Sequence, residues 1–174
     1  MQRVCLPVLL LGAMTIVGGC TDAHRSSRGL QQPRTHRDIV AVNTFYTTKP
    51  WLNFEVPPTN IPGGFKFALY TTGANSTRGV FGDGTIHIDM YRVETKAGVE
   101  TKRVRVRRWS FDTEQAYPYR AKHPVRFGRG YGFRLDWRDS DVLGKEIMIV
   151  ASFERLDGRI IYSQPKYLKV PEKV

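Results

Sequence analysis

The sequence predicts an all-β fold, a single antiparallel β-sandwich of seven to nine strands behind an export signal and a flexible tether. Short β-rich runs recur about every ten positions from residue 38 onward, with turn residues between them. No run shows the periodicity of an amphipathic helix. The 16 Gly and 10 Pro among 174 residues fit a chain with frequent turns. We therefore expect one sandwich domain over residues 38–174.

The expected strands follow the apolar runs in chain order. In residues 65–72 and 85–95, apolar side chains alternate with polar ones, which indicates strands with one buried face. Residues 131–137 alternate large rings and Leu with Gly, Arg and Asp, whereas 147–153 is apolar at both parities, as in a covered central strand. The other expected strands are 39–46, 101–111, 125–127, 159–163 and 167–170, with a loop over 73–84 and one helical turn that Asp112 and Gln115 cap.

Short antiparallel strands with bulky inward aromatic residues and long connections resemble an immunoglobulin-like β-sandwich. The cysteine pair of antibody domains is absent, so the likeness concerns the architecture alone. A transthyretin-like sandwich or a small closed barrel would give the same pattern. No disulfide is expected in the mature chain, because Cys5 and Cys20 are the two cysteines and Cys5 lies in the export signal.

The run 101–111 contains an irregularity in its alternation. Val104 and Val106 fall on one parity, whereas Trp109 and Phe111 fall on the other. Arg103, Arg105 and Arg107 share this second parity. A strand with a period of two cannot bury both apolar sets on one face without an extra residue. We therefore predict a β-bulge near Arg107–Arg108 that buries all four apolar side chains. Alternatively, the strand leaves one sheet at this point and joins the other.

The amino terminus has the features of a bacterial export signal. A short basic start precedes an apolar run over residues 4–17, which is too short to cross a bilayer as a helix. The run ends in Val17-Gly18-Gly19-Cys20, which resembles the lipobox of bacterial lipoproteins. This resemblance implies that residues 1–19 are removed, that the Cys20 thiol receives a diacylglyceryl group, and that the new amino terminus is acylated. An ordinary signal peptide with a nearby cysteine is the alternative.

Residues 20–37 are expected to form a flexible basic tether between the lipid and the domain. The segment is rich in Ser, Gln and Arg, and Leu30 is its single large apolar side chain, so it cannot form a core. A plain solvated spacer is the favoured interpretation of its arginines, and contact with anionic headgroups is the alternative. By the same resemblance, Thr21 stands where an Asp would favour inner-membrane retention, which favours the outer membrane of a cell that has one. The partner expected at this end of the chain is therefore the membrane of the cell envelope.

The whole exported chain also resembles small uncharacterised bacterial lipoproteins that carry one predicted immunoglobulin-like β-sandwich behind a lipobox. Turn and core residues carry this resemblance, and such families bring no established activity with them. The segments that carry it are Lys49-Pro50-Trp51, Gly82-Asp83-Gly84-Thr85, Trp109-Ser110-Phe111-Asp112 and Asp157-Gly158-Arg159.

Catalytic motifs are absent from the sequence of the mature chain. It has no thiol nucleophile, no Gly-x-Ser-x-Gly and no His-Glu-x-x-His, so acyl transfer is not expected. His87 and His123 are the histidines of the domain, and both are expected on its surface. Asp136, Asp139 and Asp141 could offer oxygens to Ca²⁺, but a solvated turn neutralised by the neighbouring arginine is favoured. We expect no cofactor and no metal.

Positive charge is concentrated in residues 102–134. This segment has ten basic and two acidic residues, which is +8 of the formal net charge of +11. If its strands share one sheet, a basic stripe results that would attract phosphate, sulfate or carboxylate groups. A solvated face that protects edge strands from aggregation is the alternative. The candidate anion-binding residues are Arg103, Arg105, Arg107, Arg126 and Arg134.

The sequence thus indicates a non-enzymatic, lipid-anchored envelope protein that interacts with a protein or an anionic envelope component. Nucleic acid is not an expected partner, because no recognition helix or stacking motif accompanies the charge. The alternative function is a carbohydrate-binding module, with Trp51, Tyr117 and Tyr119 as an exposed aromatic platform. An enzyme ranks third and would need a cleft in which carboxylates such as Asp89 and Asp136 converge.

Overall fold

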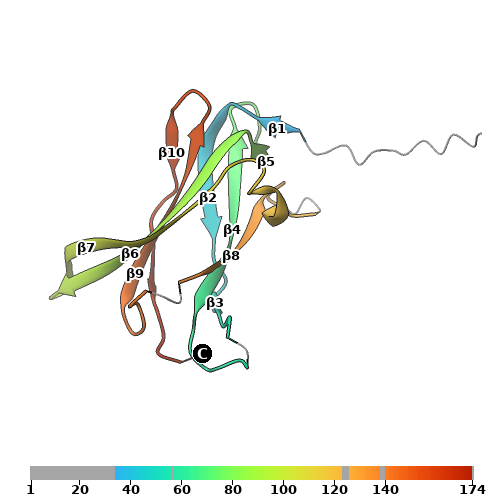
Figure 1. The fold of residues 1–174 in the computed structure, drawn as a ribbon. Helices are drawn as coiled ribbons and strands as arrows, with labels where there is room; N and C mark the ends of the chain where they lie inside the picture. The colour runs from blue at the N-terminus through green and yellow to red at the C-terminus, as the bar shows by residue number, and fades with distance from the viewer. Residues whose placement is uncertain (1–33, 56, 123–125, 138–139, 174) are drawn as a thin grey trace, which may run out of the picture. The chain divides into compact units, whose positions relative to one another are not determined.

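The computed structural model describes residues 34–55, 57–122, 126–137 and 140–173. The described chain is almost entirely β, with eleven strands and one short 3₁₀ helix, and it forms two sheets that face each other (Figure 1). The prediction of an all-β sandwich is confirmed. The predicted signal over 1–19, Cys20 and most of the predicted tether lie outside the described residues.

The first sheet is organised around one long strand, β4. Strand β4 pairs with β2 and β3 along one edge and with β5 and β8 along the other, and β5 also pairs with β1. All of these pairs are antiparallel except β1 with β5, which is parallel. The strands are β1 (Thr35–His36), β2 (Ile39–Phe45), β3 (Trp51–Leu52), β4 (Gly64–Gly73), β5 (Gly79–Gly82) and β8 (Tyr131–Asp136).

The second sheet has five antiparallel strands in the order β10-β9-β6-β7, with β11 also paired to β9. Strand β9 is the central strand that its apolar residues at both parities predict, and it pairs with β6 along its whole length. The 3₁₀ helix η1 (Tyr117–Tyr119) follows the predicted capping box, in which Asp112 Oδ1 accepts from two backbone N–H groups. The strands are β6 (Gly84–Lys96), β7 (Val99–Phe111), β9 (Glu146–Arg155), β10 (Ile160–Tyr162) and β11 (Lys166–Lys169).

Three short strands differ from the sequence prediction, so the described chain has eleven strands where the sequence predicts seven to nine. Strand β5 lies in the stretch predicted as a loop, β3 follows the first predicted strand, and β1 lies in the predicted tether, so the sheet begins before residue 38. All three are too short to show a periodicity, and backbone pairing with neighbouring strands defines them. The predicted strand over 125–127 is wrong where it is described, because Arg126 and Phe127 form a turn.

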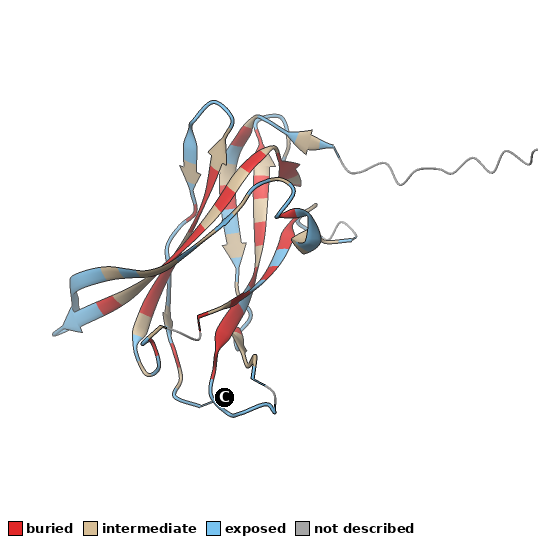
Figure 2. Cartoon of the chain, in the orientation of Figure 1, coloured by how far each residue is buried: buried red, intermediate tan, exposed pale blue. Residues whose placement is uncertain are grey.

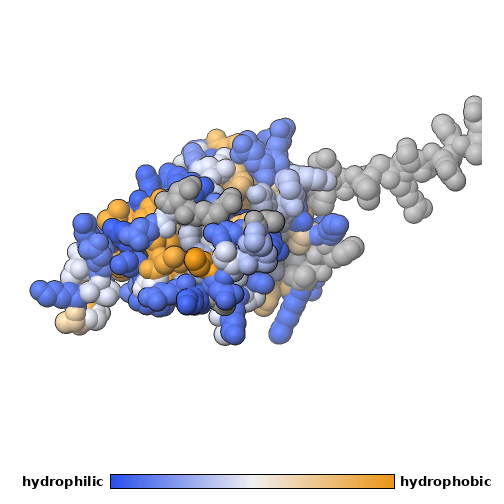
Figure 3. All heavy atoms as spheres, turned by 60° about the horizontal axis from the view of Figure 1, so that its bottom comes forward, coloured by the Kyte–Doolittle hydropathy of each residue, from blue (hydrophilic) through white to orange (hydrophobic). Residues whose placement is uncertain are grey.

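The hydrophobic core fills the space between the sheets. Buried residues are concentrated on the strand faces that meet there (Figure 2), and its largest fully buried side chains include Trp137, Tyr131 and Phe65. The Phe65 ring stacks on Trp137 with ring centroids 5.6 Å apart, and it also stacks on Phe67 at 5.6 Å. Phe65 also meets Trp109 of β7 edge-on, so this row of rings packs β4 against the second sheet. On the face shown in Figure 3, apolar patches interrupt an otherwise hydrophilic surface.

The predicted β-bulge exists, slightly earlier in the strand than expected. Arg105 pairs with Tyr91 and Arg107 pairs with Met90, so Val106 is the extra residue of β7. After the bulge, Trp109 lies opposite the fully buried Ile88 and is directed to the core side of the sheet. Strand β7 stays within its sheet, which excludes a change of sheet at this point.

The apolar residues of β7 are half-buried, although the sequence predicts full burial. Val104, Val106, Trp109 and Phe111 are all partly exposed, because β7 is the edge strand of its sheet. The last three still pack against the core, and Trp109 meets Phe65 edge-on at 5.9 Å. The bulge therefore directs these side chains inward, and the edge position leaves one side of each ring in contact with solvent.

We expect Trp137→Ala to lower the free energy of unfolding by about 3–5 kcal/mol, as large core truncations do. The Trp137 side chain is 1% exposed and contacts Phe65 and Trp51, so its loss leaves a cavity that the sheets cannot close. Trp109→Ala should cost less, since Trp109 is half-buried. Urea unfolding of the two variants measures both values. Equal losses would contradict the edge position of Trp109.

Candidate functional site

The structure does not bring the five predicted anion-binding arginines into one stripe. Arg103 and Arg105 pair with Val93 and Tyr91 and share the outer face of the second sheet, but the bulge at Val106 puts Arg107 on the opposite face. Arg134 lies on β8 in the other sheet, and Arg126 lies in a turn. The single sheet on which the stripe depends is therefore absent: β8 pairs with β4 rather than with β7.

Three of these arginines also have acidic neighbours. Arg103 donates to Glu100 at 2.8 Å, an interaction that lowers the pKa of the Glu100 carboxyl and raises that of the guanidinium. Arg105 lies 3.6 Å from Asp89, and Arg107 lies 3.7 Å from Asp136. Their charges are compensated within the domain, which weakens their attraction for an external anion. Anion binding by this particular set stays a prediction.

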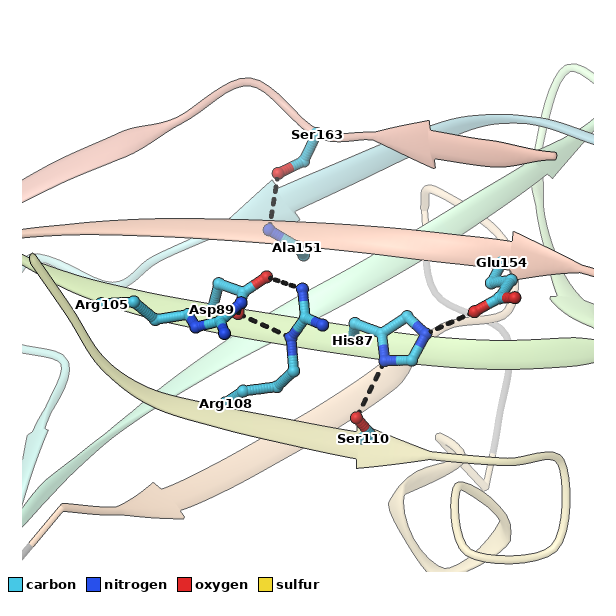
Figure 4. A network of polar contacts seen from close by, with 8 residues as sticks. All are labelled: His87, Asp89, Arg105, Arg108, Ser110, Ala151, Glu154 and Ser163. Atoms are coloured by element: carbon cyan, nitrogen blue, oxygen red, sulfur yellow. Dashed lines mark hydrogen bonds and ion pairs between the residues drawn. The ribbon is translucent and has the colours of Figure 1, made fainter. Parts of the chain in front are cut away.

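The outer face of the second sheet carries a network of polar side chains (Figure 4). Asp89 on β6 is buried, and Arg108 on β7 donates to both of its carboxylate oxygens, each at 2.7 Å. This bidentate pairing raises the pKa of Arg108, because the hydrogen bonds favour the charged guanidinium. Arg105 adds a second positive charge to the same carboxylate. The buried charge of Asp89 is thus held by two cations across one strand pair.

His87 lies next in this network, between a hydroxyl and a carboxylate. Its Nδ1 lies 2.8 Å from Ser110 Oγ and its Nε2 lies 2.9 Å from Glu154 Oε2. Ser110, His87 and Ser152 are cross-strand neighbours, so the network is a row along a sheet face. The hydroxyl of Ser110, the imidazole of His87 and the carboxylate of Glu154 are the types of group that form a catalytic triad. His87 does not line any of the cavities described below, in which a substrate could bind. We interpret the row as cross-strand pairing that stabilises the sheet. The second predicted histidine, His123, lies outside the described residues.

The residues expected for the two alternative functions are not assembled. Asp89 lies on the outer face of β6, whereas Asp136 pairs with Arg107 at the end of β8, so these carboxylates do not converge. The proposed aromatic platform is also not formed. Trp51 packs edge-on against Trp137 in the core, Tyr119 packs against Phe111 and Phe133, and Tyr117 is the exposed ring of the three.

A different group of basic residues surrounds a cavity at the end of the first sheet where β1 and β5 pair. Residues of β1, of β5 and of the 128–129 turn line a cavity of about 350 Å³ that opens to solvent. Its cationic lining consists of Arg34, Arg78 and Arg129, with His36 beside them. We call this cavity the arginine cleft. No local pattern of the sequence predicts this cleft, because its basic residues come from three separate segments of the chain.

Two glycines allow the walls of the arginine cleft to approach closely. The Gly79 N–H donates to Phe127 O at 2.7 Å, and the Arg129 N–H donates to Gly79 O at 2.8 Å. A Cβ on Gly79 would lie 2.4 Å from Arg129 O, and one on Gly128 would lie 2.6 Å from Gly79 N. Gly128 also has a φ of +96°, which a side chain would strain. The pairing that positions Arg78 near Arg129 therefore requires glycine at both positions.

The arginine cleft carries uncompensated positive charge. No acidic residue lines it, and within the described residues no carboxylate forms an ion pair with Arg34, Arg78 or Arg129. Arg129 lies over the Phe81 ring at 5.8 Å, and Arg120 lies over the same ring at 4.6 Å. These cation–π contacts orient the guanidinium groups without neutralising them.

A buried layer supports the base of the arginine cleft. The Tyr131 hydroxyl accepts from the Gly82 N–H at 3.2 Å, and its ring packs edge-on against Phe81 at 5.3 Å. Burial raises the pKa of Tyr131, and the charge of Arg120 opposes part of this effect. Arg120 Nε is buried without a hydrogen-bond partner in the described structure. Arg120, whose guanidinium group lies over the Phe81 ring, adds to the positive potential of this end of the domain.

Comparison with protein-family models, curated proteins and solved structures found no match to this chain. Within the described ranges, no helix has the length and apolar character needed to cross a membrane. Those ranges also contain no cluster of three His, Cys, Asp or Glu side chains placed to hold a metal ion. The geometry and charge of the arginine cleft therefore define the candidate functional site.

We expect Asp89→Ala to lower the free energy of unfolding by about 1–3 kcal/mol, because it leaves Arg108 without its bidentate partner. Asp141→Ala is the matched control, since Asp141 is an exposed partner of Arg92 at 3.2 Å and surface pairs contribute little. Thermal or urea unfolding measures both. If the two variants lose the same stability, burial of the Asp89 network has no energetic consequence.

Proposed function

We propose that the protein is a non-enzymatic, lipid-anchored protein of the cell envelope whose β-sandwich domain binds anionic groups in the arginine cleft. The observation that carries this proposal is the set of Arg34, Arg78 and Arg129 around one cavity with no acidic lining. Natural surfaces normally intersperse both signs of charge, since like charges repel one another. An anion in the cleft would relieve that repulsion and would accept hydrogen bonds from the guanidinium groups.

The geometry favours a phosphate, sulfate or carboxylate as the group bound. Guanidinium groups present planar forks that match the oxygens of these anions, and such charge-assisted hydrogen bonds are stronger than neutral ones. The close contact between Gly79 and Gly128 holds the chain segments that carry Arg78 and Arg129 together, so both guanidinium groups line one cavity. A volume of about 350 Å³ accommodates a small charged group with part of the molecule that carries it.

The envelope location rests on the resemblance of residues 17–20 to a lipobox. Several acyl chains on Cys20 would anchor the chain nearly permanently, because each buried methylene contributes about 0.8 kcal/mol. The domain would then meet envelope molecules, many of which carry phosphate or carboxylate groups. A basic binding cleft and a lipid anchor are consistent with one role, the attachment of the domain to an anionic envelope component.

We expect Arg34→Ala combined with Arg78→Ala to weaken the binding of inorganic pyrophosphate at least about tenfold. Each charge-assisted hydrogen bond contributes about 1.5–3 kcal/mol, and about 1.4 kcal/mol corresponds to a tenfold change in affinity. Isothermal titration calorimetry on the full acylated chain in neutral detergent measures the affinity. Rising salt should weaken binding further, because screening reduces the attraction.

Arg103→Ala combined with Arg105→Ala is the matched control for this experiment. It removes the same amount of positive charge from the outer face of the second sheet, where both arginines have acidic neighbours. Binding should be nearly unchanged in this variant. A similar loss in both double variants would support general charge attraction instead of a cleft, and a wild type that binds no pyrophosphate would contradict the proposal.

Cys20→Ser should abolish acylation of the chain. The thiol is the atom that the lipobox resemblance assigns to the thioether, and a hydroxyl does not replace it in that reaction. Metabolic labelling with a fatty acid, followed by membrane fractionation, measures the result, and Cys5→Ser serves as the control that keeps its label. If the wild-type chain takes up no fatty acid, the anchor is wrong, whereas anion binding by the domain is unaffected.

A further inference from the structure

An exposed group of aromatic rings lies beside the arginine cleft. Phe45 on β2 and Phe127 in the turn ahead of β8 stack with centroids 4.9 Å apart, and Tyr70 on β4 meets both rings edge-on. Phe45 is 44% exposed and Phe127 is 50% exposed, so a large part of both rings faces solvent. We call these three rings the aromatic patch. Exposed apolar groups gathered in this way indicate an interaction surface.

The aromatic patch and the arginine cleft form one continuous face of the domain. A cavity of about 160 Å³ lies between Tyr70, Phe127 and the basic side chains of Arg78 and Arg126. Arg78 and Gly79 line both this cavity and the arginine cleft. Cations and apolar rings therefore alternate over a short distance, without an acidic residue in either lining.

A mostly apolar groove extends the same face on the other side of Phe45. It has a volume of about 440 Å³ and runs over Ala68 and Gly132, whose small size leaves the sheet surface hollow. Lys66 and Arg134 stand at its rim, and no acidic residue lines it. Two of the five arginines predicted from sequence, Arg126 and Arg134, thus belong to this face.

The position of the amino-terminal segment adds an independent constraint. The chain enters the domain at Arg34, which itself lines the arginine cleft. A lipid on Cys20 is separated from Arg34 by a segment that spans at most about 50 Å when fully extended. The cleft is therefore the part of the domain that the chain connects most directly to the anchor. Tethering through a segment of this length raises the effective concentration of the cleft at the membrane that holds the anchor.

We propose that this face docks on the membrane that holds the lipid anchor, with the arginine cleft binding the phosphate of an anionic lipid headgroup and the aromatic patch entering the interface. This inference rests on the proposed function, since it names the source of the anion and uses the anchor. A free phosphate would explain the cleft but not the exposed rings. A lipid surface presents phosphates beside apolar chains, which matches cations beside aromatic side chains.

Docking is tested on the full acylated chain reconstituted in vesicles. With Cys5 removed and Cys20 acylated, Asn75→Cys introduces one reactive thiol in the β4–β5 connection, beside the cleft, for an environment-sensitive fluorophore. We expect its emission to rise severalfold in vesicles of two parts phosphatidylcholine to one part phosphatidylglycerol, relative to phosphatidylcholine alone. Asn60→Cys is the matched control, because it precedes β4 at the opposite end of that strand and should not respond (Figure 1).

Two double variants separate lipid docking from simple anion binding. Arg34→Ala with Arg78→Ala should abolish the fluorescence rise and weaken the binding of pyrophosphate at least about tenfold. Phe45→Ser with Phe127→Ser should abolish the fluorescence rise and leave pyrophosphate binding within about twofold, because these exposed rings do not line the cleft. This second result is the one that supports a membrane over a soluble anion.

Several outcomes would overturn the inference. If pyrophosphate binds but the label at residue 75 does not respond to anionic vesicles, the proposed function stands and lipid docking is wrong. If the label responds to soluble polyphosphate and not to vesicles, the occupant is a polymer. An equal response at residues 60 and 75 would show attraction without a defined face. If neither pyrophosphate nor vesicles bind, both proposals fail.

Discussion

The inward packing of Trp109 and Phe111, which stay half-buried at the sheet edge, determines on which face the charges of β7 lie. Both side chains share their parity with Arg103, Arg105 and Arg107, so apolar burial and exposure of charge conflict within β7. The extra residue Val106 resolves the conflict by changing the face of every residue that follows it. As a consequence, Arg107 lies on the core side of the sheet and Arg108 on its outer face, which is the reverse of simple alternation. On the outer face, Arg108 reaches the buried Asp89.

Much of the architecture follows from periodicity that a single sequence displays. Strand β8 alternates buried apolar residues with Gly, Arg and Asp, β9 is apolar at both parities, and each occurs where its pattern indicates. Even the bulge in β7 is deducible, because two apolar sets on opposite parities cannot both face a core. Periodicity does not predict strands β1 and β5. Their few residues have no period, and only pairing with each other and with β4 makes them strands.

The candidate site is harder to predict than the fold for a related physical reason. The local density of basic residues in the sequence indicates Arg103 and Arg105 as anion-binding residues. In the structure, each of them has a carboxylate partner that compensates its charge. The uncompensated cations at Arg34, Arg78 and Arg129 are far apart in sequence, and a parallel strand pair and a glycine contact bring them together. Net charge reveals that excess cations exist. It does not reveal which of them lack partners, because ion pairing is a property of tertiary structure.

The parallel attachment of β1 has a mechanical consequence. Tension applied to the chain ahead of residue 34 is transmitted first to β1, which two residue pairs, Thr35 with Phe81 and His36 with Gly82, hold against β5. The core strands begin only after this point, and Ile39 of β2 is already fully buried. Under load, β1 would therefore detach before the sandwich yields, and it would carry Arg34 and His36 out of the cleft. Force on the amino terminus would disassemble the cleft while the rest of the domain stays folded.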